Sequence, residues 1–168
     1  MEVFEAVKTV LAVRSYQDKP IPPEVTQWII EAGHLTASSM NLQPWHFIVV
    51  EDHETLKKLG ELATYGPYTA QAAMAIVVAI EETRFSISDA SRAIQSMVLT
   101  GWAEGVGSNW VGFFGLEAVN SLLGIPDELD VLAIVPFGYP VQAIGKGNKK
   151  RKPFAEVVSR ERFGQPFA

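Results

Sequence analysis

The sequence predicts a mixed fold of the α/β or α+β class, because helical and strand patterns alternate along its 168 residues. Residues 88–104 show apolar side chains at helical spacing, whereas residues 74–80 and 131–137 are short apolar runs rich in β-branched residues. Apolar residues make up 48% of the chain and charged residues 20%, which is ordinary for a globular protein. We therefore expect one domain over residues 1–168.

The N-terminal third is expected to hold two helices separated by prolines. Apolar residues at helical spacing in residues 3–13 predict an amphipathic helix. Prolines then interrupt the chain in a loop at 14–22. The sequence Pro22-Pro23-Glu24 is typical of a helix start, and the second helix carries Val25 and Ile29 among its apolar residues.

In the rest of the chain, the expected helices and strands alternate at short intervals. The polar, short-chained residues 36–44 predict a loop, and Gly105 fits the end of the long helix at 88–104. The other expected elements, by their apolar patterns, are a strand at 46–50, a short helix at 55–63, a covered strand at 74–80, a strand at 108–114, a helix at 116–123, a covered strand at 131–137 and a short helix at 154–158.

Several classes of protein are excluded or disfavoured by composition. The longest apolar run, residues 72–80, is about half of the roughly 18 residues that a membrane-spanning helix needs, so we expect no membrane partner. The N-terminus lacks the basic region of a secretory signal. The chain has no cysteine, which excludes disulfides, thiolate nucleophiles and cysteine-based metal sites. A cytoplasmic protein is the expectation that fits best.

The net charge of −5 is unevenly distributed. Residues 1–143 carry 7 basic and 17 acidic side chains, whereas residues 144–168 carry 7 basic and 2 acidic ones. A solvated tail, a nucleic-acid surface and a site for one small anion such as a phosphate monoester all fit such a basic arm. The acidic body would repel a nucleic-acid backbone, so we expect no nucleic-acid partner.

The sequence shows no evident catalytic machinery of its own. The three histidines lack metal-ligand spacing, and we expect no metal site. The motifs of the hydrolase nucleophile elbow, the P-loop and the Rossmann fold are absent. An enzyme of this kind would depend on a cofactor. The segment from Thr36 to Trp45 offers hydroxyl, amide and backbone N–H donors to a polar ligand, although a cap-rich turn has the same composition.

That polar segment also carries a resemblance to a known family. Ser38-Ser39-Met40-Asn41-Leu42-Gln43-Pro44-Trp45-His46-Phe47 resembles the Ser-Ser-x-Asn-x-Gln-Pro-Trp-x-Phe signature of the nitroreductase family of FMN-dependent oxidoreductases. Three further segments fit the same family in the same order. The first is Val13-Arg14-Ser15-Tyr16 with Asp18-Lys19-Pro20-Ile21, and the second is Gly107-Ser108-Asn109-Trp110-Val111-Gly112. The third is Phe137-Gly138-Tyr139-Pro140 with Lys150-Arg151-Lys152-Pro153-Phe154. The resemblance implies an α+β fold with a central, mostly antiparallel sheet flanked by helices. It also implies an intertwined homodimer with FMN at the interface.

The resemblance implies a phosphate site made from both ends of the chain. Arg14 would contact the flavin phosphate or ribityl chain, and Lys149 and Arg151 in the basic arm at 144–168 would complete the phosphate site. The family commonly has Arg-Arg-Ser where this chain reads Val10-Leu11-Ala12. A second alignment places Arg14-Ser15 on the Arg-Ser pair with a deletion after it, and both alignments keep Arg14 as a ligand.

The same resemblance implies contacts to the flavin ring and the ribityl chain, from Ser38, Ser39, Asn41, Gln43, Val111 and Gly112. The two serines and the asparagine would bond the ring edge or the ribityl hydroxyls across the dimer interface. Gln43 occupies a signature position whose role is partly structural. The backbone around Val111 and Gly112 would lie near flavin N5.

The implied reaction is a ping-pong cycle. FMN takes a hydride from NADH or NADPH at N5 and passes the electrons to a small organic oxidant, such as a nitroaromatic compound or a quinone. The alternative is a flavin-binding protein without steady-state turnover, such as a carrier or a sensor, which the departure at Val10-Leu11-Ala12 favours.

Overall fold

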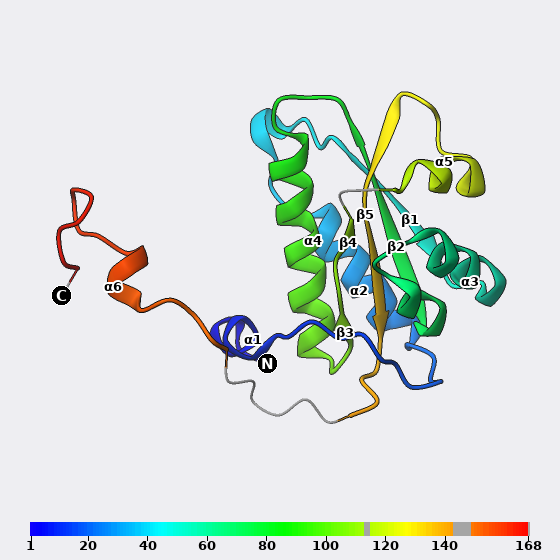
Figure 1. Cartoon of the computed structure of the whole chain (residues 1–168), viewed down its shortest axis with the longest axis horizontal. Coiled ribbons are helices and arrows are strands. Elements are labelled where there is room, and N and C mark those ends of the chain that lie inside the picture. The colour runs from blue at the N-terminus through cyan, green and yellow to red at the C-terminus, as the bar shows by residue number, and fades with distance from the viewer. Residues whose placement is uncertain (113–114, 143–148, 168) are drawn as a thin grey trace.

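The computed structural model describes residues 1–112, 115–142 and 149–167. Its centre is a five-stranded sheet in the order β1-β2-β5-β3, with β4 also paired to β5 (Figure 1). The strands are β1 (Trp45–Val50), β2 (Met74–Glu81), β3 (Gly107–Ser108), β4 (Val111–Gly112) and β5 (Leu129–Gly138). All four pairings between these strands are antiparallel, which confirms the α+β class and excludes the α/β alternative.

Helices lie on both faces of the sheet (Figure 1). They are α1 (Val3–Thr9), α2 (Pro23–His34), α3 (His53–Leu62), α4 (Ser86–Ala103), α5 (Glu117–Leu123) and α6 (Phe154–Val157), and two short 3₁₀ turns cover Ser39–Asn41 and Pro67–Gln71. Each expected helix is present, with ends shifted by a few residues. No helix in the described part of the chain is long and apolar enough to cross a membrane.

The central strand β2 divides the core into two layers. Successive side chains of a strand point to opposite faces. Ile76 and Val78 therefore pack with α2 and α4, whereas Val77 packs with α3 and α5 on the other face. All three side chains have no exposed surface, which confirms the expectation of a strand covered on both faces.

Two expected elements differ in extent. The predicted helix at 3–13 ends at Thr9, because Ala12 forms a parallel bridge with Ser108 and the backbone N–H of Val13 donates to the Ser108 carbonyl at 2.9 Å. The predicted strand at 108–114 is broken into β3 and β4, and its last two residues lie outside the described residues. At the first place, pairing with a distant segment ends the helix.

The C-terminal segment forms an arm that extends away from the sheet and its helices (Figure 1). Apolar side chains remain exposed on this arm and on α1: Phe154 is 64% exposed, Phe163 is fully exposed and Phe4 on α1 is 74% exposed. The apolar stripe of α1 therefore does not pack into the core of its own chain. These surfaces are available to a partner chain.

One hydrogen bond ties α1 to α4. Trp102 Nε1 donates to Thr9 Oγ1 at 2.9 Å, and the Trp102 side chain is half-buried. We predict that Trp102→Phe lowers the free energy of unfolding by about 1 kcal/mol, because it removes this bond and keeps most of the apolar contact. Urea unfolding checks the value. Thr9→Ser keeps a hydroxyl at the same place and should retain the bond.

Candidate functional site

The polar loop after α2 has an unusual backbone. Met40, Asn41 and Gln43 have φ values of 53°, 56° and 51°, in the left-handed region. Such a conformation costs most residues other than glycine and asparagine about 1–2 kcal/mol, so at Met40 and Gln43 it persists only where the surroundings impose it. Three such residues within four positions mean that the surroundings of the loop must hold its shape.

Hydrogen bonds from two directions hold this loop. Within the loop, the backbone N–H of Gln43 donates to Ser38 Oγ at 2.9 Å. Towards α4, the Ser39 hydroxyl donates to Asp89 Oδ1 at 3.0 Å and its backbone N–H donates to Asp89 Oδ2 at 2.9 Å. Ser39 is thus engaged inside its own chain. Ser38 accepts its bond, so its hydroxyl proton remains available for a ligand.

Asp89 has a buried side chain, and Arg92 forms an ion pair with it from the next turn of α4. Removal from water raises the pKa of Asp89, but the hydrogen bonds from Ser39 and the charge of Arg92 outweigh that effect and lower its pKa. Asp89 is therefore ionised at neutral pH. Neither residue is predicted from the sequence, because an acid in the first turn of a helix is already explained by the helix dipole and Arg92 alone carries no motif.

A second group of predicted residues surrounds the segment after α1. Arg14 lines a hollow of about 290 Å³ between residues 12–15 and 140–142. Val10, Leu11 and Ala12 line an adjacent hollow of about 210 Å³ against α4 and residues 108–110. Ala12 lines both hollows, so the exposed cation of Arg14 lies on the same backbone segment as the smaller hollow. This smaller hollow, which we call the groove, is lined by several apolar side chains.

Val111 and Gly112 form β4 beside this groove. Val111 pairs with Ile134 and has a buried side chain, and Gly112 pairs with Ala133. Tyr68 accepts a short hydrogen bond from the side-chain amide of Asn109, just before β4. These contacts fix the backbone that the resemblance places near flavin N5.

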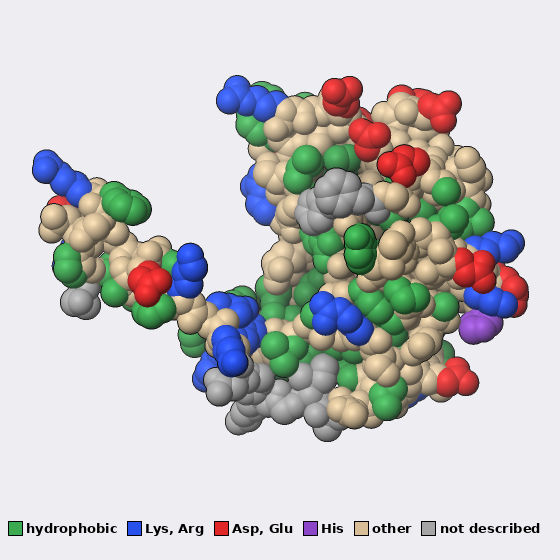
Figure 2. All heavy atoms as spheres, viewed as in Figure 1, with side chains coloured by type: hydrophobic (Ala, Val, Ile, Leu, Met, Phe, Trp, Pro, Cys, Tyr) green, Lys and Arg blue, Asp and Glu red, His purple; other side chains and the backbone are tan. Residues whose placement is uncertain are grey.

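The described part of the basic arm begins against α1. Lys149 Nζ donates to the Val7 carbonyl at 2.6 Å, and Arg151 Nη1 donates to the Lys150 carbonyl at 2.9 Å. Partial removal from water and the neighbouring Arg151 charge lower the pKa of Lys149. Basic side chains gather at the root of the arm (Figure 2). Residues 144–148 of the predicted arm lie outside the described residues.

The two groups of predicted residues lie on different flanks of α4. The loop contacts Asp89, Arg92 and Ser96, whereas the groove contacts Ser91 and Gln95. At about 100° per residue, these two sets of residues are about 110° apart around the exposed side of α4, and each is about 120° from the face that packs into the core. One chain therefore does not bring the loop and the Arg14 segment around the same groove.

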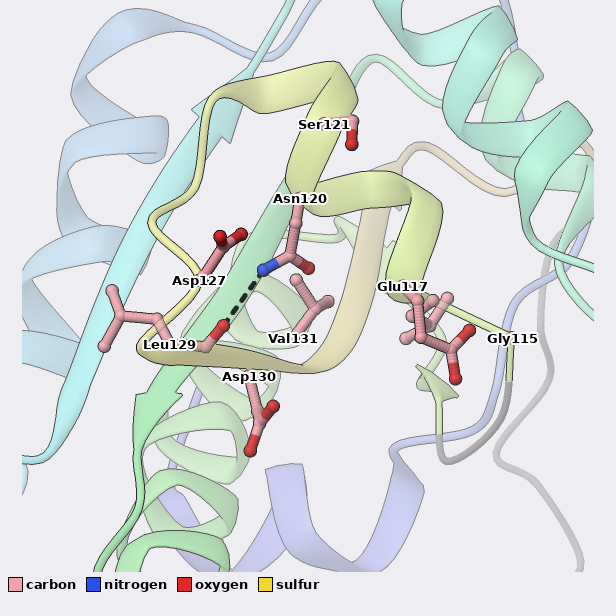
Figure 3. Close-up of a pocket in the computed structure, with 9 residues that line it drawn as sticks. Gly115, Glu117, Asn120, Ser121, Asp127, Leu129, Asp130 and Val131 are labelled. Atoms are coloured by element: carbon pink, nitrogen blue, oxygen red, sulfur yellow. Dashed lines mark hydrogen bonds between the residues drawn. The ribbon is translucent and has the colours of Figure 1, made fainter.

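A larger hollow of about 430 Å³ lies elsewhere, between α5 and β5 (Figure 3). Glu117, Asp127 and Asp130 line it, and Asn120 Nδ2 donates to the Leu129 carbonyl at 3.0 Å across it. None of the predicted flavin residues lines this hollow. Its three carboxylates would repel a phosphate, so its size does not make it the cofactor site.

Known proteins resemble this chain in sequence. The family model described as "Nitroreductase family" matches residues 11–81 and 63–139. A protein of Archaeoglobus fulgidus, provisionally named NADH dehydrogenase/NAD(P)H nitroreductase, is 36% identical over 95% of this chain and 92% of its own length. A protein of Methanothermobacter thermautotrophicus with the same provisional name is 34% identical over 86% of this chain and 81% of its own length.

Solved structures give the same result for the fold. An FMN-dependent nitroreductase of Clostridium difficile superposes with a TM-score of 0.85 at 26% identity, covering 95% of this chain and 99% of its own. The NADPH:FMN oxidoreductase of Vibrio harveyi, solved with NAD⁺, has a TM-score of 0.84 at 26% identity, covering 96% and 77%. The central, mostly antiparallel sheet that the resemblance implied is confirmed. The chain belongs to the nitroreductase family.

Proposed function

We propose that this protein is an FMN-dependent oxidoreductase that uses NADH or NADPH, acts in the cytoplasm and works as a homodimer. The observation that carries the proposal is the strained loop at Ser38–Gln43, which holds hydroxyl and amide groups in a fixed, partly exposed arrangement. The names of related proteins point the same way: one is a Bacillus subtilis FMN reductase [NAD(P)H], 27% identical over 96% of this chain.

The residues present fit FMN in charge and in polarity. Arg14, Lys149 and Arg151 supply cations for a phosphate group, and arginine can contact phosphate with two N–H donors at once. The groove beside Ala12 supplies apolar surface for a flat ring. Val10-Leu11-Ala12 contributes neither charge nor hydroxyl. Binding of the phosphate therefore depends on Arg14 and on the cations of the C-terminal arm, within a single domain of 168 residues.

A second copy of the chain would complete the site. The loop at Ser38–Gln43 lies on the far flank of α4 from the groove, and Met40 and Leu42 in that loop are 77% and 50% exposed. The apolar faces of α1 and the arm are also exposed. Association of two copies would cover this surface and carry the loop of one chain to the groove of the other.

FMN, when bound, would supply the redox chemistry, which is hydride transfer from NADH or NADPH and electron transfer to a small organic oxidant in a ping-pong cycle. The chain's own residues would bind the cofactor and orient it. Ser38 and Asn41 would hold the ring edge or ribityl hydroxyls, and the backbone of Val111 and Gly112 would face N5, where an N–H donor stabilises developing negative charge. The fixed β4 backbone keeps that donor in place.

The experiment uses purified protein loaded with FMN under anaerobic conditions. Addition of NADH or NADPH should bleach the flavin absorbance, and subsequent addition of a nitroaromatic compound or a quinone should restore it without new donor. Retention of FMN with no bleaching by either donor would instead identify a flavin carrier or sensor. Failure to bind FMN would refute the proposed function.

A further inference from the structure

We infer that Asp89, held by Arg92, is a positioning residue that fixes the Ser38–Gln43 loop in the conformation that binds the flavin. The inference rests on the proposed function. The structure places the Asp89 carboxylate against Ser39, and the Asp89 side chain has no exposed surface with which to contact a ligand. Asp89 would therefore act on cofactor affinity through the loop.

The contacts of Asp89 are those of an anchor. Both of its oxygens are used: one accepts from the Ser39 hydroxyl and from Arg92, and the other accepts from the Ser39 backbone N–H. The Asp89 side chain has no exposed surface, whereas that of Arg92 is 52% exposed. A buried carboxylate with three donors is held in one position, and it holds Ser39 in turn.

The anchor lies next to the strained part of the loop. Met40 and Asn41, which follow Ser39 directly, have φ values of 53° and 56°. A second link, from Thr36 Oγ1 to Ser96 Oγ at 2.8 Å, fixes the start of the loop two turns further along α4. A loop pinned before its strained residues cannot relax by shifting along the helix.

The same contacts limit what Ser39 can do. Its hydroxyl proton and its backbone N–H are both donated to Asp89, so towards a ligand the Ser39 hydroxyl can act only as an acceptor. Donor contacts from this loop then fall to Ser38 and Asn41. The anchor thereby divides the two signature serines into one that positions the loop and one that can donate to the ligand.

The chain contains a matched control for the anchor. On α3, Asp52 Oδ2 accepts from the backbone N–H of Thr55 at 2.9 Å and from its hydroxyl at 2.7 Å. Asp52 thus bonds the backbone and hydroxyl of one residue as Asp89 does, but through a single oxygen, at an exposed position that caps α3. Asp52→Asn tests the general effect of losing such a carboxylate, and Asp89→Asn tests the position.

The first measurement is the FMN dissociation constant of each variant, by equilibrium dialysis. Asp89→Asn is expected to raise it about tenfold, whereas Asp52→Asn should leave it unchanged. If Asp89 acts through Ser39, Asp89→Asn should weaken FMN binding clearly less in the Ser39→Ala variant than in the wild-type protein. Full additivity of the two changes would contradict the inference.

The second measurement is amide hydrogen exchange of the flavin-free proteins, which does not depend on turnover. Asp89→Asn should speed exchange at Ser39 and leave Thr55 unchanged, and Asp52→Asn should do the reverse. If Asp89→Asn does not fold, Arg92→Ala removes one partner at a half-exposed position and should weaken FMN binding about threefold. A folded anchor variant with wild-type affinity refutes the inference alone, whereas a wild-type protein that binds no FMN refutes the proposed function as well.

Discussion

Replacement of both Lys149 and Arg151 by alanine is expected to weaken FMN binding about a hundredfold and to leave riboflavin binding nearly unchanged. Riboflavin lacks the phosphate, so the comparison isolates the contribution of the phosphate contacts. The effect should be large in this chain because Val10-Leu11-Ala12 supplies no cation from the N-terminal segment. Arg14 would then be left as the one predicted cationic ligand.

The control for that variant must change the charge by the same amount elsewhere. Lys57 and Lys58 lie on α3, away from the groove and the arm, and their replacement by alanine removes two positive charges. FMN affinity should stay at the wild-type value in this control. Equal losses for FMN and riboflavin in the arm variant would show that the arm acts on the fold or on the dimer rather than on the phosphate.

Gly107→Ala is expected to lower the free energy of unfolding by about 3 kcal/mol. A Cβ at this position would overlap Val13 Cγ2 and lie 2.9 Å from Val13 Cβ. Val13 is buried, β-branched and tied to Ser108 through its backbone N–H, so it has little room to yield. The added methyl group would push residues 12–15 away from β3.

Gly105→Ala provides the comparison within the same turn. Gly105 has φ of +77°, but no atom lies within 4 Å of the position of its Cβ, so alanine there costs about 1 kcal/mol of backbone strain. Because residues 12–15 carry Arg14, Gly107→Ala should also weaken FMN binding. Combination with Val13→Ala removes the Cγ atoms and should restore part of the binding. Equal destabilisation by Gly105→Ala and Gly107→Ala would contradict the predicted clash.

The elements that were predicted correctly are those with a strong local pattern. The apolar run at 74–80 and the long helix at 88–104 are both central to the core, and each was recognisable from its own residues. The helix predicted at 3–13 was too long because its last residues pair with Ser108, almost 100 positions away. Helical spacing cannot reveal such a competing long-range contact.

The candidate site was partly visible in the sequence. The resemblance predicts roles for Ser38–Gln43 and Arg14, and the structure places the first in a loop bonded to α4 and the second beside a hollow. The left-handed backbone at Met40 had no local signal, since methionine has no preference for it. Asp89 could not be found either, because its partner Ser39 lies 50 residues away and the contact exists only after α4 has packed beside the loop.

The measurement that tests the shared site most directly is complementation between two defective chains. One carries Ser38→Ala and Asn41→Ala, and the other carries Lys149→Ala and Arg151→Ala. Mixed dimers are purified through two different tags and their bound FMN is counted. If each site takes its loop from one chain and its cations from the other, a mixed dimer has one intact site and binds about one FMN, half of the wild-type content. A mixed dimer that binds no more FMN than either parent would place both residue groups in the same chain's site and contradict a shared site.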